Sequence, residues 1–408
     1  MLCTAFTLIV PRTLFPESAH ARTKAPPSTD RMPETASSKG AHTDACTQAW
    51  DVLHIAAGCW ACGGGLSEAM ASLALAQARR GDRVAVLYVA DHPEHPLLAR
   101  VREAGGEVLP IQRAYSWPGY FAPRLLRLLP TLLPRARRLH LHGCWSFPIW
   151  WAARCARRAS VPYALSAHGA FCAAACRRGA ARKALFLRLV GRPLLARARE
   201  LFAASSTEAE ALANTLRALD ITPAPPIRLL PNGIDTELFD SVSAQPRRQV
   251  FLYLGRLHPL KGLDLLLEAW TLARLESAWE LWIVGPDDGA RLPPLPRGVI
   301  QKPACALEAK ARLIKSAAAV VLPSRSENFG LVVAEALYCH TPAICTTGAP
   351  WPELGDFQVA PTSEAIADAL VRFAALSEPA REARFAPLFE AAAKRFSWTE
   401  ILATFPQH

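Results

Sequence analysis

The sequence predicts an α/β protein made of two tandem Rossmann-like domains that face each other across a cleft. Two units of strand, glycine-containing turn and helix carry this prediction, one beginning at Val52 and the other at Val250. A polar segment over residues 241–248, which contains Pro246, separates the two units. Short apolar runs that alternate with helical stretches are typical of parallel sheets covered by helices. The 408 residues suffice for two domains of ordinary size.

The first domain opens with an apolar strand over residues 52–57, a glycine loop and an amphipathic helix over 67–80. Gly81-Asp82 is a stop-and-turn signal, and a second strand follows over 84–90. Further strands are expected over 108–110, 139–142, 163–166, 201–204 and 227–230, with helices over 182–198 and 207–219. The turn at 231–235 would close this domain.

The second domain repeats the pattern with a strand over 250–254, a turn over 255–262 and a helix over 263–275. Further strands are expected over 281–284, 299–300, 317–322 and 343–345, and a helix begins near residue 331. We therefore place the first domain at 50–240 and the second at 246–394. A C-terminal helix over 395–408 is expected to pack back on the first domain.

Residues 1–49 are rich in Pro, Ser and Thr without sustained periodicity, which predicts a flexible tail. Its apolar start is short and follows no basic residue, so a signal peptide is disfavoured, and Met32 is an alternative start. The uncharged run 159–176 contains Pro162, His168 and Gly169 and predicts a buried strand with a loop, not a membrane helix. We expect a cytoplasmic protein.

The net charge of +11 is unevenly distributed, because residues 121–199 hold 16 Lys and Arg and no Asp or Glu. This favours an anionic partner, either a phosphate-bearing substrate or an anionic membrane face reached through segment 121–130. An ordinary solvated basic surface without a partner is an alternative interpretation of equal weight. Nucleic acid is disfavoured, since no zinc-finger, RNA-recognition or helix-turn-helix pattern accompanies the charge.

Eleven scattered cysteines argue against a disulfide framework. Cys59 and Cys62 have the C-x-x-C spacing of redox or zinc sites, and Cys172 and Cys176 form a second pair. Together they would supply four thiolates to one zinc ion. The alternative, which we favour, is that they are small apolar packing residues.

Two cations, Arg256 and Lys261, lie on one turn beside Gly255 and Gly262. The glycines let backbone approach a phosphate closely, and the helix that follows offers free N–H groups and the positive end of its dipole. Departure of a diphosphate from a sugar leaves negative charge that fixed cations stabilise. The turn therefore predicts a diphosphate clamp.

Glu327 and Glu335 lie eight residues apart across a loop-to-helix junction. We expect Glu327 at the carboxyl end of a strand, where ligands bind in open parallel sheets, and Glu335 about one turn into the helix. Glu335 is flanked by alanines in an apolar stretch, where an unpaired carboxylate would be costly. Two such acids are suited to hold the hydroxyls of a sugar and a ribose.

Histidines follow two of the predicted strands. His168 precedes Gly169 at a strand end and is expected to face the cleft. His140 and His142 share one strand, and at most one of them is expected to reach the site. A histidine in an apolar stretch is commonly a hydrogen-bonded core residue, so function is favoured for His168 and only weakly for His142.

These motifs, in this order over residues 50–405, resemble the retaining glycosyltransferases of family 4, also called glycosyl transferases group 1, which have the GT-B fold. The resemblance implies that Arg256 and Lys261 bind the donor diphosphate, that Glu335 binds the ribose, and that Glu327 and His168 contact the donor sugar. It further implies a nucleotide-sugar site that also includes Gly64, Gly65, Gly255, Asn328, Phe329, Gly330 and Leu331. No metal or other cofactor is implied, since the leaving phosphate itself takes the acceptor's proton.

The sequence thus predicts a transferase that uses a nucleotide-diphosphate sugar and extends a polysaccharide or lipid-linked saccharide. The alternatives are an epimerase or phosphorylase on the same fold, or a non-catalytic scaffold that binds sugar nucleotides. The chain departs from the family after residue 354, where relatives carry a longer segment, and in the loop around Cys172.

Overall fold

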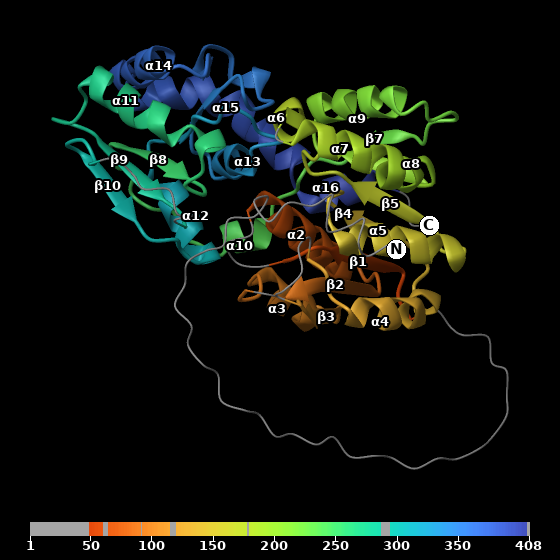
Figure 1. Ribbon diagram of the computed structural model, residues 1–408. Coiled ribbons are helices and arrows are strands. Elements are labelled where there is room, and N and C mark those ends of the chain that lie inside the picture. Colours follow the sequence, from red (N-terminus) through yellow and green to blue (C-terminus); the bar gives the residue numbers. More distant parts are fainter. Residues whose placement is uncertain are drawn as a thin grey trace, which may run out of the picture.

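The computed structural model describes residues 49–59, 64–90, 92–114, 120–177, 179–286 and 294–405. Each of the two lobes in Figure 1 is built on its own parallel sheet. The predicted tail and Cys62 lie outside the described residues. Within the described part, no helix is long and apolar enough to cross a membrane.

The first lobe holds a seven-stranded parallel sheet of order β3-β2-β1-β4-β5-β6-β7. Its strands are β1 (Val52–Ala56), β2 (Val84–Ala90), β3 (Glu107–Gln112), β4 (Leu139–His142), β5 (Tyr163–Ser166), β6 (Glu200–Ala203) and β7 (Ile227–Leu229). Order reverses beside β1, which pairs with β2 on one edge and with β4 on the other. Every residue of β1 is buried, as expected for a central strand covered on both faces.

The helices of this lobe are α2 (Gly65–Arg79), α3 (Leu97–Glu103), α4 (Arg124–Leu132), α5 (Phe147–Arg158), α6 (Ala173–Arg177), α7 (Ala180–Phe186), α8 (Arg192–Ala196) and α9 (Ser206–Ala218). The next helix, α10 (Thr236–Asp240), packs against the second lobe, where its Phe239 is part of the core. Short helical turns are η2 (Leu133–Arg135) and η3 (Leu187–Gly191). The helical stretch expected over 182–198 is confirmed, because α7, the π-helical turn η3 and α8 follow one another without a break. The π-helical turn was not expected, and Pro193, which lacks an N–H donor, lies just after it.

The second lobe holds a six-stranded parallel sheet of order β10-β9-β8-β11-β12-β13. Its strands are β8 (Val250–Leu254), β9 (Glu280–Val284), β10 (Val299–Lys302), β11 (Ala319–Leu322), β12 (Ala343–Thr346) and β13 (Gln358–Val359). Its helices are α11 (Leu263–Ala273), α12 (Leu307–Ser316), α13 (Leu331–Tyr338), α14 (Ser363–Ala375) and α15 (Glu378–Arg395), with turns η4 (Pro259–Lys261) and η5 (Pro352–Phe357). Both sheets therefore have the strand order that is typical of a doubly wound domain.

The last helix, α16 (Trp398–Ala403), packs against the first lobe although it follows α15 of the second. Figure 1 shows α16 beside α2 and β4. Its Trp398, Ile401 and Leu402 form one buried cluster with Leu73 of α2. Gly233 makes this packing possible, because a Cβ at that position would lie 2.3 Å from the Trp398 ring. The chain therefore crosses between the lobes twice.

Candidate active site

The basic turn of the second domain lies directly against the first domain. Gly262, at φ +67°, precedes α11, and a Cβ there would lie 2.0 Å from the carbonyl oxygen of Pro323. Glycine is therefore required to seat this turn beside the loop that follows β11. On the other side, a Cβ at Gly64 would lie 3.1 Å from Nε of Arg256. The predicted glycine loop and the predicted clamp thus face each other across the domain boundary.

Glu327 is held on the loop after β11 by three contacts. Its backbone N–H donates to the carbonyl of Gly348 at 2.7 Å, and its Oε1 accepts from Ser324 Oγ at 2.8 Å. The same Oε1 accepts from Nζ of Lys261. One predicted site acid is therefore joined to one predicted clamp cation within the second domain.

Glu335 lies about one turn into α13, as expected, and is 3% exposed. Lys310 of α12 donates to Glu335 Oε1 at 2.6 Å and to Glu68 Oε1 of α2 at 2.5 Å. This lysine thus bridges a carboxylate of each domain. Burial raises the pKa of Glu335 to about 8, against the opposing effect of the Lys310 ammonium. Burial also disfavours ionised Glu68, but the nearby ammonium holds its pKa below the usual value.

The His168 loop is shaped by backbone strain and by a buried carboxylate. His168 and Gly169 have φ of +50° and +79°. Glu208 of α9 accepts from the N–H of Gly169 at 2.5 Å and from that of Ala204 at 2.7 Å. Burial of Glu208 raises its pKa above the ordinary value, while these backbone bonds oppose the rise.

Asn328 contacts this loop from the second domain. A Cβ at Gly169 would lie 3.1 Å from the Asn328 Cβ, and Ser205 Oγ donates to the Asn328 carbonyl at 2.9 Å. The neighbouring Phe329 side chain is 6% exposed and packs against Trp351 with ring centroids 5.5 Å apart. Only the main chain of Phe329 is therefore placed to face a ligand.

His140 and His142 point to one face of the sheet, with ring centroids 4.2 Å apart. His142 Nδ1 lies 3.0 Å from His168 Nε2, whereas His140 Nε2 lies 2.8 Å from Ser166 Oγ. Of the two, only His142 reaches the predicted site histidine. His54 joins them from β1, and its ligand atoms lie within 4.8 Å of those of His140 and His142.

The described thiols do not gather into a metal site. Cys59 Sγ lies 3.7 Å from the carbonyl of Ser67, and Cys176 Sγ lies 3.9 Å from that of Ala170. Among the described residues, the group of three or more potential ligands that comes together consists of the three histidines named above. The four-thiolate site has no support here, although Cys62 lies outside the described part.

Comparison with known proteins decides the family. The family described as "Glycosyl transferase 4-like domain" matches residues 64–233, and "Glycosyl transferases group 1" matches residues 248–375. The chain belongs to the group 1 glycosyltransferases. The two matched segments correspond to the two lobes and include all the site residues predicted above.

Curated relatives of this group 1 glycosyltransferase match over limited segments. A D-inositol 3-phosphate glycosyltransferase of Segniliparus rotundus is 33% identical over 139 residues, which cover 29% of this chain and 31% of the relative. One from Xylanimonas cellulosilytica is 28% identical over 207 residues, covering 43% and 49%. The matches thus span 31% and 49% of these relatives' length.

Solved structures show the fold. Sucrose-phosphate synthase from Thermosynechococcus elongatus superimposes with a TM-score of 0.58 at 20% identity, covering 86% of this chain and 96% of that one. Trehalose 6-phosphate synthase from Burkholderia multivorans gives 0.62 at 13% identity, covering 87% and 96%. The predicted GT-B architecture of two Rossmann-like domains is confirmed.

Sequence reasoning missed three acids and bases of this group 1 glycosyltransferase: Lys310, Glu208 and Glu68. A weak signal existed for Glu208, because Ser205-x-x-Glu208 is a capping-box pattern. Lys310 lies in a partly apolar helix and pairs with residues 242 and 25 positions away, so no local pattern reveals its role.

Proposed function

We propose that this protein is a retaining glycosyltransferase that moves a sugar from a nucleotide-diphosphate sugar to a saccharide acceptor. The observation that carries the proposal is the approach of Arg256 to Gly64, which sets the basic turn against the first βα loop of the other domain. A diphosphate at this boundary would meet two cations and the N-terminus of α11 together.

Each site residue receives a role from its position. Arg256 and Lys261 would hold the diphosphate and stabilise the charge that develops on it, and Lys261 would then be shared with Glu327. Glu327 would contact the donor sugar. Glu335, held by Lys310, would accept hydrogen bonds from the hydroxyls of the ribose. Gly65, Gly255, Gly330 and Leu331 remain predicted backbone contacts of the donor.

The transfer would proceed on one face of the sugar. The bond from the anomeric carbon to the diphosphate oxygen breaks, and the acceptor hydroxyl oxygen bonds to the same carbon. The acceptor's proton passes to the leaving phosphate, so the site needs fixed cations but no separate protein base. This route uses no metal, and transfer in the presence of a chelator would test that point.

Nucleotide binding tests the proposal directly. Titration calorimetry with UDP, GDP and ADP should detect binding of at least one of them. Arg256→Ala and Lys261→Ala should weaken it by about 10- to 100-fold, the effect of losing a hydrogen bond to a charged group. Arg274→Ala, at the exposed C-terminal end of α11, is the matched control. Failure of all three nucleotides to bind would overturn the proposal.

The identity of the donor and the stereochemistry of the transfer are determined by a second experiment. A panel of nucleotide sugars screened for hydrolysis would identify the donor. The anomeric configuration of the transferred sugar, measured by proton NMR, should match that of the donor. An inverted product would contradict the retaining mechanism while leaving nucleotide binding intact.

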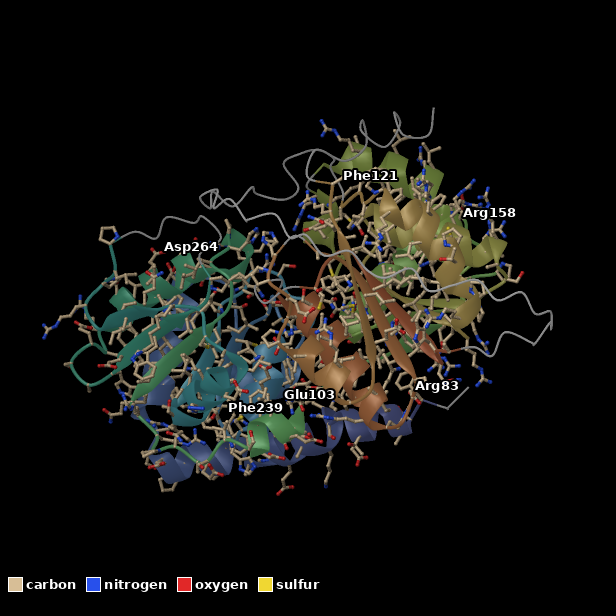
Figure 2. The ribbon with its side chains drawn as sticks, turned by 90° about the horizontal axis from the view of Figure 1, so that it is seen from below. Arg83, Glu103, Phe121, Arg158, Phe239 and Asp264 are labelled. Carbon is tan, nitrogen blue, oxygen red and sulfur yellow. The ribbon has the colours of Figure 1, made fainter. Side chains whose placement is uncertain are left out.

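The acceptor is proposed to be a polysaccharide or lipid-linked saccharide at an anionic membrane face. The segment expected to dock, 121–130, supplies less apolar surface than predicted, because Phe121 is 8% exposed and Leu125 is fully buried. Leu185 and Leu189, 50% and 61% exposed, lie beside Arg182 and Arg188 instead. In Figure 2, the labelled Arg158 lies on the side of this lobe away from Asp264 of the second domain.

Cosedimentation tests this contact. Vesicles that contain phosphatidylglycerol should retain the protein, and pure phosphatidylcholine vesicles should not. Replacing Leu185 and Leu189 with serine should reduce retention, whereas Leu272→Ser, an equally exposed site on α11, should not. Equal retention by both kinds of vesicle would count against an anionic membrane partner.

A further inference from the structure

A row of buried side chains runs from the amino ends of the strands of the first sheet to the candidate active site. Gln77 Oε1 of α2 lies 2.7 Å from His54 Nε2, and His54 Nδ1 lies 2.9 Å from His142 Nε2. His142 Nδ1 in turn lies 3.0 Å from His168 Nε2. Three hydrogen bonds in series therefore link Gln77 to the histidine that begins the site loop.

The two ends of the row lie in different surroundings. Gln77 lines an open cavity of about 100 Å³ together with residues from the starts of strands, among them Leu139 and Glu200. His168 follows the carboxyl end of β5 and lines a small cavity with Glu208. The row thus runs along one face of the sheet, from the amino ends of its strands toward their carboxyl ends.

The orientation of the Gln77 amide, whose Oε1 faces His54, sets the direction of every bond in the row. An amide oxygen can only accept, so His54 must carry its proton on Nε2 and accept at Nδ1. His142 must then donate from Nε2 and accept at Nδ1, and His168 must donate from Nε2. The unprotonated Nδ1 of His168 remains as an acceptor for a further partner.

All three imidazoles are held in the neutral form that this pattern requires. His54 and His142 are at most 1% exposed, and Gln77 is 6% exposed. Burial lowers the pKa of His54 and of His168 to about 4, and that of His142 well below its ordinary value. An imidazolium at His54 or His142 would place two donors face to face and break the row.

We propose that Gln77, His54 and His142 are positioning residues that fix His168 as the Nε2–H tautomer, so that its Nδ1 accepts a hydrogen bond from a hydroxyl of the donor sugar. This assignment rests on the proposed function for its sugar partner. A hydroxyl that donates to nitrogen carries more negative charge on its oxygen, which favours the positive charge that develops on the sugar ring.

The row ends on an amide, and this decides between positioning and proton conduction. A carboxylate or water at the end would accept a proton and release it. An amide oxygen holds the hydrogen bond but does not carry a proton onward at neutral pH. The row is therefore suited to setting a tautomer and not to exporting protons from the site.

The tautomers can be read on the full-length protein without any ligand. With histidine rings labelled with ¹⁵N, two-bond correlation spectra at pH 7.5 should show His54, His142 and His168 as neutral Nε2–H rings, with resonances assigned from single His→Asn variants. Gln77→Met should convert His168 to a mixture of tautomers, because Met cannot accept strongly from His54. Gln77→Glu, which keeps an acceptor, should restore the single tautomer.

Ser72→Ala is the control, since Ser72 is buried on the same helix and bonds only to the Ala69 carbonyl among described contacts. A protonated Nδ1 on His168 in the wild type would overturn the proposal. So would an unchanged His168 tautomer in folded Gln77→Met, or one zinc ion per chain bound by His54, His140 and His142. Nucleotide titration of the same variants separates this outcome from failure of the proposed function, because Gln77 is remote from the clamp.

Once the donor is known, kinetics adds a second readout. Gln77→Met should lower kcat about tenfold with little change in KM, as expected for one hydrogen bond strengthened in the transition state. If Ser72→Ala lowers kcat and thermal stability as much as Gln77→Met does, the role of Gln77 is merely structural. That result would contradict positioning.

Discussion

The two domains present different polar groups to their shared boundary: charged pairs on the second domain, and one carboxylate, Glu68, with a row of neutral histidines on the first. The second domain contributes carboxylates that each hold a lysine, Glu327 with Lys261 and Glu335 with Lys310. The first contributes neutral buried histidines joined by hydrogen bonds, ending at His168. The difference indicates that one side is built to bind charge, and the other to present neutral hydrogen-bonding groups of fixed direction.

Acid should damage the histidine side first, and this is the largest expected effect. The folded pKa values of His54 and His168 are lowered to about 4, so the unfolded chain binds protons that the native protein excludes once pH falls below about 6.5. Between pH 6.5 and 5 these two groups should cost about 3 kcal/mol of unfolding free energy, and His140 and His142 add to it. Urea unfolding across this range measures the loss of unfolding free energy. An unfolding free energy that does not change with pH would show that the histidines take up protons as readily in the native state as in the unfolded chain.

Removing the lysine that joins the domains should damage the charged side most. Lys310→Met removes the cation that keeps buried Glu68 ionised beside Glu335, which should cost about 3–5 kcal/mol. Chemical denaturation provides the measurement. The triple variant with Glu68→Gln and Glu335→Gln should recover much of the loss, because no buried charge then lacks a partner. A single variant as stable as wild type would mean that water reaches the cluster.

Alkali should weaken the same cluster more gently. The pKa of Glu335 is raised to about 8, so its contribution is present below the unfolded value of 4.5 and is lost as pH rises toward 8. Above pH 6.5, where the histidine effect has ended, unfolding free energy should fall by up to about 1.4 kcal/mol per pH unit. Glu335→Gln should flatten this slope. An unchanged slope in that variant would assign the proton to Glu68.

The smallest effect should come from the contact that joins the two sides. Ser205 caps α9 by accepting from the Glu208 N–H at 3.2 Å, and it donates to Asn328 across the boundary. Ser205→Ala should cost about 1 kcal/mol of stability. Ser377→Ala, which removes the cap of α15 within the second domain, is matched in kind. If both variants bind nucleotide equally well, the Ser205 contact does not position the site.

The charged side was more readily predicted from sequence than the neutral side. Arg256, Lys261 and Glu327 lie within turns whose glycines and strand ends are visible locally, so their placement at one sheet edge followed from the fold. Their function as donor ligands stays a prediction. The helical stretch over 182–198 was predicted, but its π-helical turn η3 was not, because the apolar periodicity does not record how the helix adapts ahead of Pro193.

The architecture and the cationic turn follow from the amino-acid sequence alone, because strand, turn and helix signals act over a few residues and repeat in both domains. The pairing of groups follows only from the tertiary structure: Lys310 with Glu68, 242 residues apart, Glu208 with Gly169, and Gln77 with His168 through two other histidines. Such pairings depend on which buried atoms lack a partner after the sheets assemble, and no local pattern records that requirement.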